Sequence, residues 1–266
     1  MLKKVLVLLM AAIMLVGCVA CGPDEPAGPT ATPERSNTGD PLVDNLLFHV
    51  DFSKESHEDV VRNAKATVAE GEGVGTITYV EDEEEGKVAN FQNTCVAYDI
   101  DLNSIGKNYT MEAYVKCKKQ GGLGVICGTY FHNDKAGVSF TAGMFDTGNG
   151  KFFGSAKAVA IVSGTLTSTR TIETGYYRQW NHLVFVHDGE TGKETYYLNG
   201  VAVPGYEDGV NVMKGPMKHS RTDSTFKIGA YNGGAQFAVE DMNLAYVKLY
   251  DFAATADNVK TMFDNK

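Results

Sequence analysis

Short runs of apolar residues recur along the chain, separated by glycine, asparagine and aspartate. In residues 109–118, tyrosine, methionine, alanine, valine and cysteine fill the odd positions, and mostly polar residues fill the even positions. This period of two is typical of a β-strand with an inner and an outer face. Helical periodicity is almost absent from the folded part, so the pattern predicts an all-β architecture.

Two consecutive hairpins are predicted in the second half of the chain. Residues 183–187 form an apolar run, which is expected of a strand covered on both faces. Turn residues at 188–192 separate it from a returning strand at 194–198. Asn199-Gly200 is a second tight turn, because both residues tolerate positive φ, and a strand at 201–203 follows.

The chain is expected to end in β-strands and a short helix. Residues 225–228 and 236–239 are predicted strands that bracket a glycine-rich loop, and residues 244–250 form the last strand. Within residues 251–263, Thr255 is a candidate N-cap with Asn258 three positions later. This helix is expected to cover one edge of the fold, which would shield an exposed strand.

The N-terminus has the features of an export signal. Two lysines at positions 3–4 precede an apolar stretch, residues 5–16, that is too short to span a bilayer. Residues 15–18, Leu-Val-Gly-Cys, resemble the lipobox of bacterial lipoproteins, in which the cysteine becomes the acylated N-terminus. We therefore expect a signal peptide at 1–17, lipidation of Cys18, and a secreted protein held at the cell envelope by its lipid. An ordinary secretory signal that contains a cysteine is the alternative.

Composition divides the rest of the chain into a tether and one domain. Residues 18–43 are rich in proline, glycine, threonine and acidic residues and contain few large apolar ones, so they are expected to remain disordered. Residues 44–266 have a length that is ordinary for one large β-sandwich. The net charge of −9 argues against a nucleic-acid partner. The acidic run at 81–85 is interpreted as a solvated loop, with cation binding as the alternative.

Three cysteines fall in the predicted domain, so at most one internal disulfide can form. Cys117 and Cys127 flank a glycine-rich segment, residues 120–124. If that segment is a tight turn, the two cysteines lie opposite each other on adjacent strands and could form a disulfide. Two buried free thiols are equally compatible with the sequence.

Several sequence blocks occur in an order that is specific to one family. They comprise residues 108–116, 180–186 with Asp188-Gly189, 197–200, 226–229, 242–250 and 258–262. Together these blocks resemble the bacterial laminin-G-like domains of the concanavalin A-like lectin/glucanase superfamily. The resemblance implies a jelly-roll sandwich of two antiparallel sheets with a short C-terminal helix. It also implies that Trp180 packs between the sheets, while His182 and His187 are interpreted as packed side chains rather than ligands.

The resemblance further implies a structural calcium ion. Members of this class often hold calcium between the opening strand, here residues 47–52, and the closing strand. This nominates Asp51 and Asp241 as tentative ligands, because calcium takes carboxylate and carbonyl oxygens.

Motifs for catalysis are missing from the sequence. Glycoside hydrolases need two carboxylates on opposite sides of the scissile bond, and relatives in this superfamily use Glu-x-Asp-x-x-Glu on one strand. That spacing does not occur, and Asp99-Ile100-Asp101 lacks the third group. Neither G-x-S-x-G nor H-E-x-x-H is present. We therefore expect a binding module without catalytic activity.

Carbohydrate binding requires aromatic faces for stacking and nearby polar groups for the hydroxyls. Two predicted loops supply such residues: Tyr130, Phe131, His132, Asn133 and Asp134 in the first, and Tyr231, Asn232 and Gln236 in the second. The sequence therefore predicts a carbohydrate-binding module whose partner is a glycan or polysaccharide. A protein-binding adhesion or structural role remains an alternative, as does a glycoside hydrolase or lyase whose groups come from different strands.

Overall fold

The structure is a computed structural model of the chain. It describes residues 36–100, 105–119, 124–128, 137–142, 156–162, 165–171, 178–203, 205, 207–211, 214–216, 225–230 and 238–266. The predicted signal peptide, Cys18 and most of the predicted tether lie outside these residues. None of the helices in the described ranges is long and apolar enough to cross a membrane.

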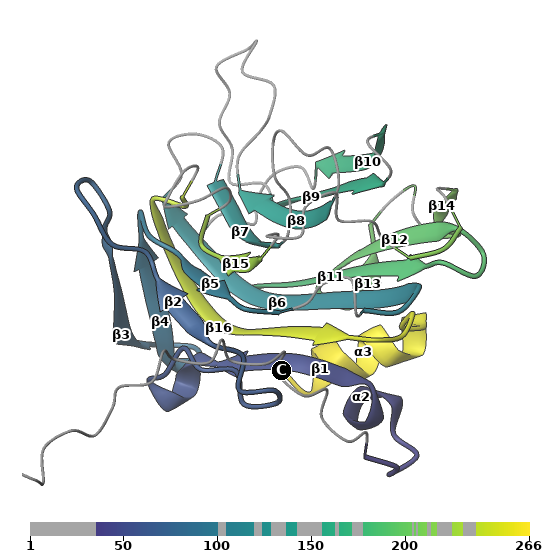
Figure 1. Cartoon of the computed structure of the whole chain (residues 1–266), viewed down its shortest axis with the longest axis horizontal. Helices are drawn as coiled ribbons and strands as arrows, with labels where there is room; N and C mark the ends of the chain where they lie inside the picture. Colours follow the sequence, from purple (N-terminus) through teal and green to yellow (C-terminus); the bar gives the residue numbers. More distant parts are fainter. Residues whose placement is uncertain are drawn as a thin grey trace, which may run out of the picture. The chain divides into compact units, whose positions relative to one another are not determined.

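The first sheet is antiparallel and contains the long strands of the fold (Figure 1). Its strand order is β13-β12-β11-β6-β16-β4-β3, with β1 also paired to β16 and β14 to β12. The bounds are β1 Leu46–Asp51, β3 Thr76–Asp82, β4 Gly86–Gln92, β6 Asn108–Lys119, β11 Asn181–Asp188, β12 Lys193–Leu198, β13 Val201–Ala202, β14 Val210–Asn211 and β16 Asp241–Tyr250. The predicted hairpins β11-β12 and β12-β13 are confirmed.

The second sheet is also antiparallel, in the order β10-β9-β8-β7-β15-β5-β2. Its strands are β2 Ala66–Val68, β5 Val96–Tyr98, β7 Gly124–Gly128, β8 Gly137–Ala142, β9 Ala156–Val162, β10 Thr165–Thr171 and β15 Phe226–Ile228. Two antiparallel sheets and a short C-terminal helix confirm the predicted fold class.

Aromatic side chains from both sheets meet in the main core. The ring of Phe48 on β1 packs edge-on against Tyr98 on β5 and Phe226 on β15, with centroids 4.9 and 5.2 Å apart. All three residues are completely buried. Burying a side chain of this size contributes about 2 to 3 kcal/mol, so this contact between sheets is a principal source of stability.

The central strand β6 is buried on both faces. Its odd positions, including Met111 and Ala113, point into the core between the sheets, as the alternation predicted. The even positions Thr110, Glu112 and Tyr114 are also buried, although they face away from the second sheet. The outer face of the first sheet is therefore covered by further parts of the chain.

Helix α3, Ala256–Asp264, covers one region of that outer face. Thr255 and Asn258 form a capping box at its start, which confirms the predicted N-cap. Val259 and Met262 pack in one cluster with side chains of β11 and β12. Figure 1 shows the helix on the side of β6 and β16 opposite β7, β8 and β9. The helix thus covers part of a sheet face and also contacts the edge strand β13.

The connection from β6 to β7 is not a hairpin, because the two strands belong to different sheets. Cys117 on β6 and Cys127 on β7 are therefore not cross-strand neighbours, and both are free thiols in the structure. Burial raises the pKa of the Cys117 thiol to about 12. The alternative of two free thiols describes the structure, and the cross-strand disulfide does not.

The described chain begins inside the segment predicted as a tether. Helix α2, Pro41–Asp44, has Asp40 as its N-cap and proline in its first turn. The Asp44 carboxylate accepts hydrogen bonds from the backbone N–H groups of Thr38 and Gly39. These local contacts order the residues directly before β1, which the composition alone did not indicate.

Candidate functional site

A groove lies on the outer face of the second sheet, over β2, β5 and β15. Thr67, Ala97 and Lys227 are register partners across these three strands. Their neighbours Val96, Tyr98, Phe226 and Ile228 point into the core, so alternation directs the three partners outward. The groove encloses about 770 Å³ and is lined by Lys65, Ala66, Thr67, Val68, Ala69, Glu70, Cys95, Ala97 and Lys227.

Small side chains and one buried cation form the floor of this groove. Lys227 is only 6% exposed, and burial lowers the pKa of its ammonium group. Cys95 is 2% exposed, and burial raises the pKa of its thiol. The described lining contains no aromatic ring, and its one carboxylate belongs to Glu70. The groove has the size of a small-ligand site and a positive charge on its floor.

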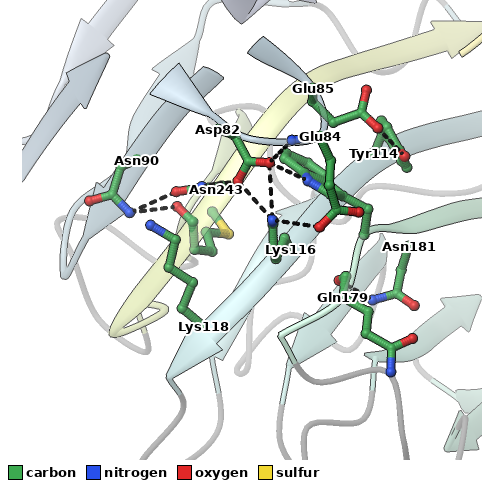
Figure 2. Close-up of polar contacts among 12 residues, drawn as sticks. Asp82, Glu84, Glu85, Asn90, Tyr114, Lys116, Lys118, Gln179, Asn181 and Asn243 are labelled. Carbon is green, nitrogen blue, oxygen red and sulfur yellow. Dashed lines mark hydrogen bonds and ion pairs between the residues drawn. The ribbon is translucent and has the colours of Figure 1, made fainter. Parts of the chain in front are cut away.

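A network of polar side chains occupies the outer face of the first sheet, near the β3-β4 hairpin. Figure 2 shows Asp82 at its centre. The Asp82 carboxylate accepts hydrogen bonds from Lys116 Nζ at 2.8 Å, Trp180 Nε1 at 3.0 Å and Asn243 Nδ2 at 3.0 Å. Burial alone would raise the pKa of Asp82, but these donors hold it well below its usual range.

Two side chains of the acidic hairpin tip contact neighbouring strands, although the tip itself is largely exposed. Glu85 accepts a hydrogen bond from the Tyr114 hydroxyl at 2.6 Å, and Glu84 pairs with Lys116 at 3.2 Å. The rings of Tyr114 and Trp180 lie against each other with centroids 4.9 Å apart. Glu81, Glu83 and Glu84 are exposed, as the interpretation of residues 81–85 as a solvated loop expected, whereas Asp82 and Glu85 have partners on the sheet face.

A buried carboxylate, Glu112, lies farther along the same face. Its oxygens accept hydrogen bonds from His182 Nε2 at 2.9 Å, Tyr246 at 2.9 Å and Tyr250 at 2.7 Å. Lys248 Nζ lies 3.7 Å from Glu112 Oε1. Burial would raise the pKa of Glu112, yet the His182 hydrogen bond and the Lys248 charge lower it to about 2.

Both polar clusters on the first sheet bind mainly to themselves. Asp82 and Glu112 are each surrounded by donors of the same chain, and the neighbouring Trp180 and Tyr246 are at most 9% exposed. A stacking site needs an accessible ring face, which these rings do not offer. We therefore take the groove over β2, β5 and β15 as the candidate functional site and the two clusters as parts of the framework.

A comparison with known protein families agrees with the two-sheet fold. Residues 90–260 match the family model described as Concanavalin A-like lectin/glucanases superfamily. The chain belongs to this superfamily. This confirms the resemblance drawn from the sequence blocks.

Several solved structures with a similar fold are binding domains. Domain 4 of AbnA, a GH43 extracellular arabinanase from Geobacillus stearothermophilus, was solved in complex with arabinotriose. It superposes with a TM-score of 0.59 at 18% identity, over 82% of this chain and 98% of that one. No curated protein matches the sequence.

Two toxin fragments show the same similarity over part of their length. The binding domain of Paraclostridial Mosquitocidal Protein 1 superposes with a TM-score of 0.60 at 13% sequence identity. The binding domain of botulinum neurotoxin DC, solved in complex with SialylT, superposes with a TM-score of 0.57 at 11% sequence identity. Each match covers 84% of this chain. The chain spans about half of those toxin chains, 52% and 51% respectively. At these identities the similarity establishes a shared fold.

The stacking residues predicted from the sequence lie outside the described residues. These are Tyr130, Phe131, His132, Asn133, Asp134, Tyr231, Asn232 and Gln236. The described residues that precede the two loops are Gly128 on β7 and Ala230 after β15. Gly128 is the register partner of Lys227, and β15 forms one wall of the groove. Both loops therefore leave from strands at the candidate site.

The tentative calcium ligands Asp51 and Asp241 are not brought together. Strands β1 and β16 do pair, but Asp51 lies opposite Tyr246, five residues from Asp241. Five strand residues span about 16 Å, which is too far for one ion. Asp51 caps a short turn through Ser53, and Asp241 accepts a hydrogen bond from Asn90. Within the described ranges, no group of three or more His, Cys, Asp or Glu side chains is placed to hold a metal.

Trp180 is buried but does not pack between the sheets. It clusters with Tyr114 and Tyr246 on the outer face of the first sheet, because it shares a strand face with His182. His182 and His187 are completely buried, and each contacts a glutamate, Glu112 and Glu194 respectively. The expectation for Trp180 is corrected, and both histidines are packed side chains.

Sequence inspection missed Lys227. A lysine between two buried residues, Phe226 and Ile228, is a local signal that one strand face differs from the other. The groove forms because Lys227 on β15 pairs with Ala97 on β5, which pairs in turn with Thr67 on β2. Both partners lie far from Lys227 in the sequence.

We expect Asp82→Ala to lower the free energy of unfolding by about 3 kcal/mol, because it leaves the mostly buried Lys116 ammonium without its main partner. Trp180 is the single tryptophan of the chain, so its fluorescence reports on this cluster. Denaturant unfolding should show a lower midpoint, and the native emission should shift to longer wavelength as the indole gains water.

The matched control is Glu190→Ala, which removes an exposed partner of Lys107. Exposed ion pairs contribute less than about 1 kcal/mol, so this variant should unfold almost like the wild type. Equal midpoints for Asp82→Ala and Glu190→Ala would contradict a structural role for Asp82.

Glu112 should make stability depend on pH in the acid range. Its pKa is lowered in the folded state from 4.5 to about 2. Its contribution is therefore complete above about pH 4.5 and is lost as the pH falls toward 2, amounting to roughly 3 kcal/mol. Unfolding measured from pH 7 to pH 2 should show a shallower pH slope for Glu112→Gln than for the wild type. Parallel curves would rule out this assignment.

Proposed function

We propose that this protein is a lipid-anchored, cell-envelope module that binds carbohydrate and has no catalytic activity of its own. The observation on which the proposal depends is the groove over β2, β5 and β15, since the residues that precede the two nominated loops, Gly128 and Ala230, lie on β7 and directly after β15.

The dimensions of the groove suit an oligosaccharide. Its volume of about 770 Å³ falls within the range of 300–1,000 Å³ that is usual for small-molecule sites. Tyr130 follows Gly128 by two residues, and Tyr231 directly follows Ala230, so a few residues of chain separate each tyrosine from the groove wall. Aromatic rings from these loops would add the stacking faces that the described floor lacks.

The arabinanase domain supports a glycan as ligand. It matches this chain over 98% of its own length, so the comparison covers a whole domain, and it was solved with arabinotriose bound. The botulinum neurotoxin DC binding domain was solved with SialylT. The match covers only 51% of that toxin chain, so the argument for a sugar ligand depends on the arabinanase domain.

A hydrolytic function finds less support. Hydrolysis of a glycosidic bond requires two carboxylates about 5 to 10 Å apart. The described lining of the groove contributes one, Glu70, which is exposed. The buried carboxylates Asp82 and Glu112 lie on the other sheet and are occupied by their own hydrogen-bond donors.

A docking surface for another protein is also less well supported. Within the described ranges, the large apolar side chains that are exposed are Val43, Val60 and Val201. They come from α2, the segment after β1 and the edge strand β13. Single exposed valines are normal on a soluble surface and do not form a patch.

A glycan array tests the proposal. We expect saturable binding of the full-length chain, held in mild detergent, to at least one oligosaccharide. Replacing Tyr130 or Tyr231 by alanine should weaken that binding about tenfold, because each ring stacks on a sugar face. Val201→Ala, on an edge strand of the other sheet, is the control and should bind normally.

The array is run with calcium and with a chelator, which tests the predicted calcium ion at the same time. Affinity that disappears with the chelator would support a bound calcium ion. Absence of binding to every glycan in both conditions, with an intact fold, would overturn the proposed function.

The lipid anchor is tested separately by metabolic labelling with a clickable fatty acid in a bacterial host. We expect the wild-type chain to incorporate label and to fractionate with membranes. Cys18→Ser should abolish both properties, since the thiol is the acylation site, whereas Cys21→Ser should leave them unchanged. Labelling of Cys18→Ser would exclude the lipoprotein assignment.

A further inference from the structure

We propose that the edge strand β3 is a docking surface at which an extended, basic segment of another protein adds as a further strand of the first sheet. This surface is separate from the groove, so the proposal does not depend on carbohydrate binding. It also differs from an apolar patch, because the added strand is held mainly by backbone groups.

Strand β3 ends the first sheet on one side, next to β4 (Figure 1). It pairs with β4 over all 7 of its residues without a register shift. Successive residues of an antiparallel strand direct their N–H and C=O groups alternately to its two sides, so one set points away from β4. In the described ranges, no backbone hydrogen bond joins residues 76–82 to any segment other than β4. The open side of β3 therefore offers a row of donors and acceptors to an added strand.

Other edge strands of the fold have features that hinder such pairing. Strands β13 and β2 are only 2 and 3 residues long. Strand β10 is as long as β3, but its ladder contains a register shift and its sequence contains Arg170. Residues 76–80 of β3 are uncharged, contain no proline and are rich in β-branched side chains. A regular edge of this length is suited to strand addition.

The charges around this edge indicate the chemistry of the partner. Residues 70–85 contain seven acidic residues, at positions 70, 72 and 81–85, and no lysine, arginine or histidine. Glu70 and Glu72 precede β3, while Glu81 and Glu83 lie at its other end, and all four are exposed. A strand added beside β3 would therefore meet carboxylates near both of its ends, which favours lysine or arginine in the partner.

Lysines of this chain offset only part of that charge. Lys87 lies 3.4 Å from Glu81. Lys116 lies 2.8 Å from Asp82 and 3.2 Å from Glu84. In the described ranges these two lysines are the cations paired with the seven carboxylates, so the edge remains acidic.

A second copy of this chain fits the edge poorly. Antiparallel pairing of two β3 strands about Tyr79 would place Asp82 opposite Thr76 and the hairpin tip, residues 83–85, beside residues 73–75. The acidic tip of one copy would then approach the acidic residues 70 and 72 of the other copy. Like charges that face each other on paired strands are destabilising, so the occupant is a basic segment of a different chain.

Alternating basic and apolar residues in the partner would match both faces of β3. Ile77 and Tyr79 pack against the main core and are only partly buried, so an apolar side chain added on that face would gain and provide burial. Thr76 and Thr78 are exposed on the opposite face. Lysine side chains added there can remain in water and still reach the carboxylates.

Titration of the full-length chain, held in mild detergent, with a synthetic peptide tests the proposal. The probe is a capped peptide of about nine residues in which lysine alternates with valine, a length that matches β3. We expect saturable binding that weakens at least about tenfold when glutamate replaces every lysine. Methylating the backbone nitrogens of one alternating set should weaken binding to a similar extent, because it removes the donors that face β3. Methylating the other set, which faces solvent, should have little effect.

Hydrogen exchange and a matched pair of variants locate the bound peptide. Binding should slow amide exchange within residues 76–82 and leave the edge strand β13 unchanged. Thr78 is exposed in the middle of β3, so substitutions there leave the core intact. Thr78→Lys adds a cation to the edge and should weaken binding about tenfold. Thr78→Gln, of similar size and without charge, should bind almost like the wild type.

Three results would overturn the proposal. The first is absence of binding by the basic peptide, or binding without slower exchange in residues 76–82. The second is equal affinity of folded Thr78→Lys and Thr78→Gln. The third is exchange in residues 76–82 that slows with protein concentration alone, together with a dimer in sedimentation, which would assign the edge to a second copy of this chain.

Discussion

The buried carboxylate of Glu112 constrains the three central strands of the fold. It lies on β6 and accepts hydrogen bonds from His182 on β11 and from Tyr246 and Tyr250 on β16. Because side chains alternate between faces, a slip of one residue in β6 would place this charge in the apolar core between the sheets. Leaving it there without partners would cost several kcal/mol. The Glu112 cluster thus specifies a register that the apolar residues alone define less sharply.

The two sheets use their outer faces differently. On the first sheet, α3 covers one region and the acidic hairpin tip another, so that β6 and β11 are buried on both faces. Charged groups there find partners within the chain, as Asp82 does with Lys116 and Trp180. On the second sheet, β2 and β5 present small side chains to the outside, and a groove remains beside Lys227. The two polar clusters and the candidate site therefore lie on opposite sides of one core.

Much of this fold could be predicted from the sequence because the evidence is local. The alternation in β6, the apolar run of β11 and the capping pair Thr255 and Asn258 each act within a few residues. Pairing between distant segments could not be read in this way. The glycine-rich segment after Cys117 is compatible with a hairpin and with a connection to the other sheet. In the structure it connects β6 to β7 in the other sheet. The family resemblance implied that Trp180 packs between the sheets, whereas in the structure it packs against Tyr114 and Tyr246 on the outer face of the first sheet.

The groove could not be predicted from the sequence for the same reason. Thr67, Ala97 and Lys227 come from three separate segments that only strand pairing brings into one row. Phe226 and Ile228 anchor the backbone of β15 in the core, so the backbone under Lys227 is already ordered before a ligand arrives. A ligand that bound in this groove would therefore require less ordering of the protein.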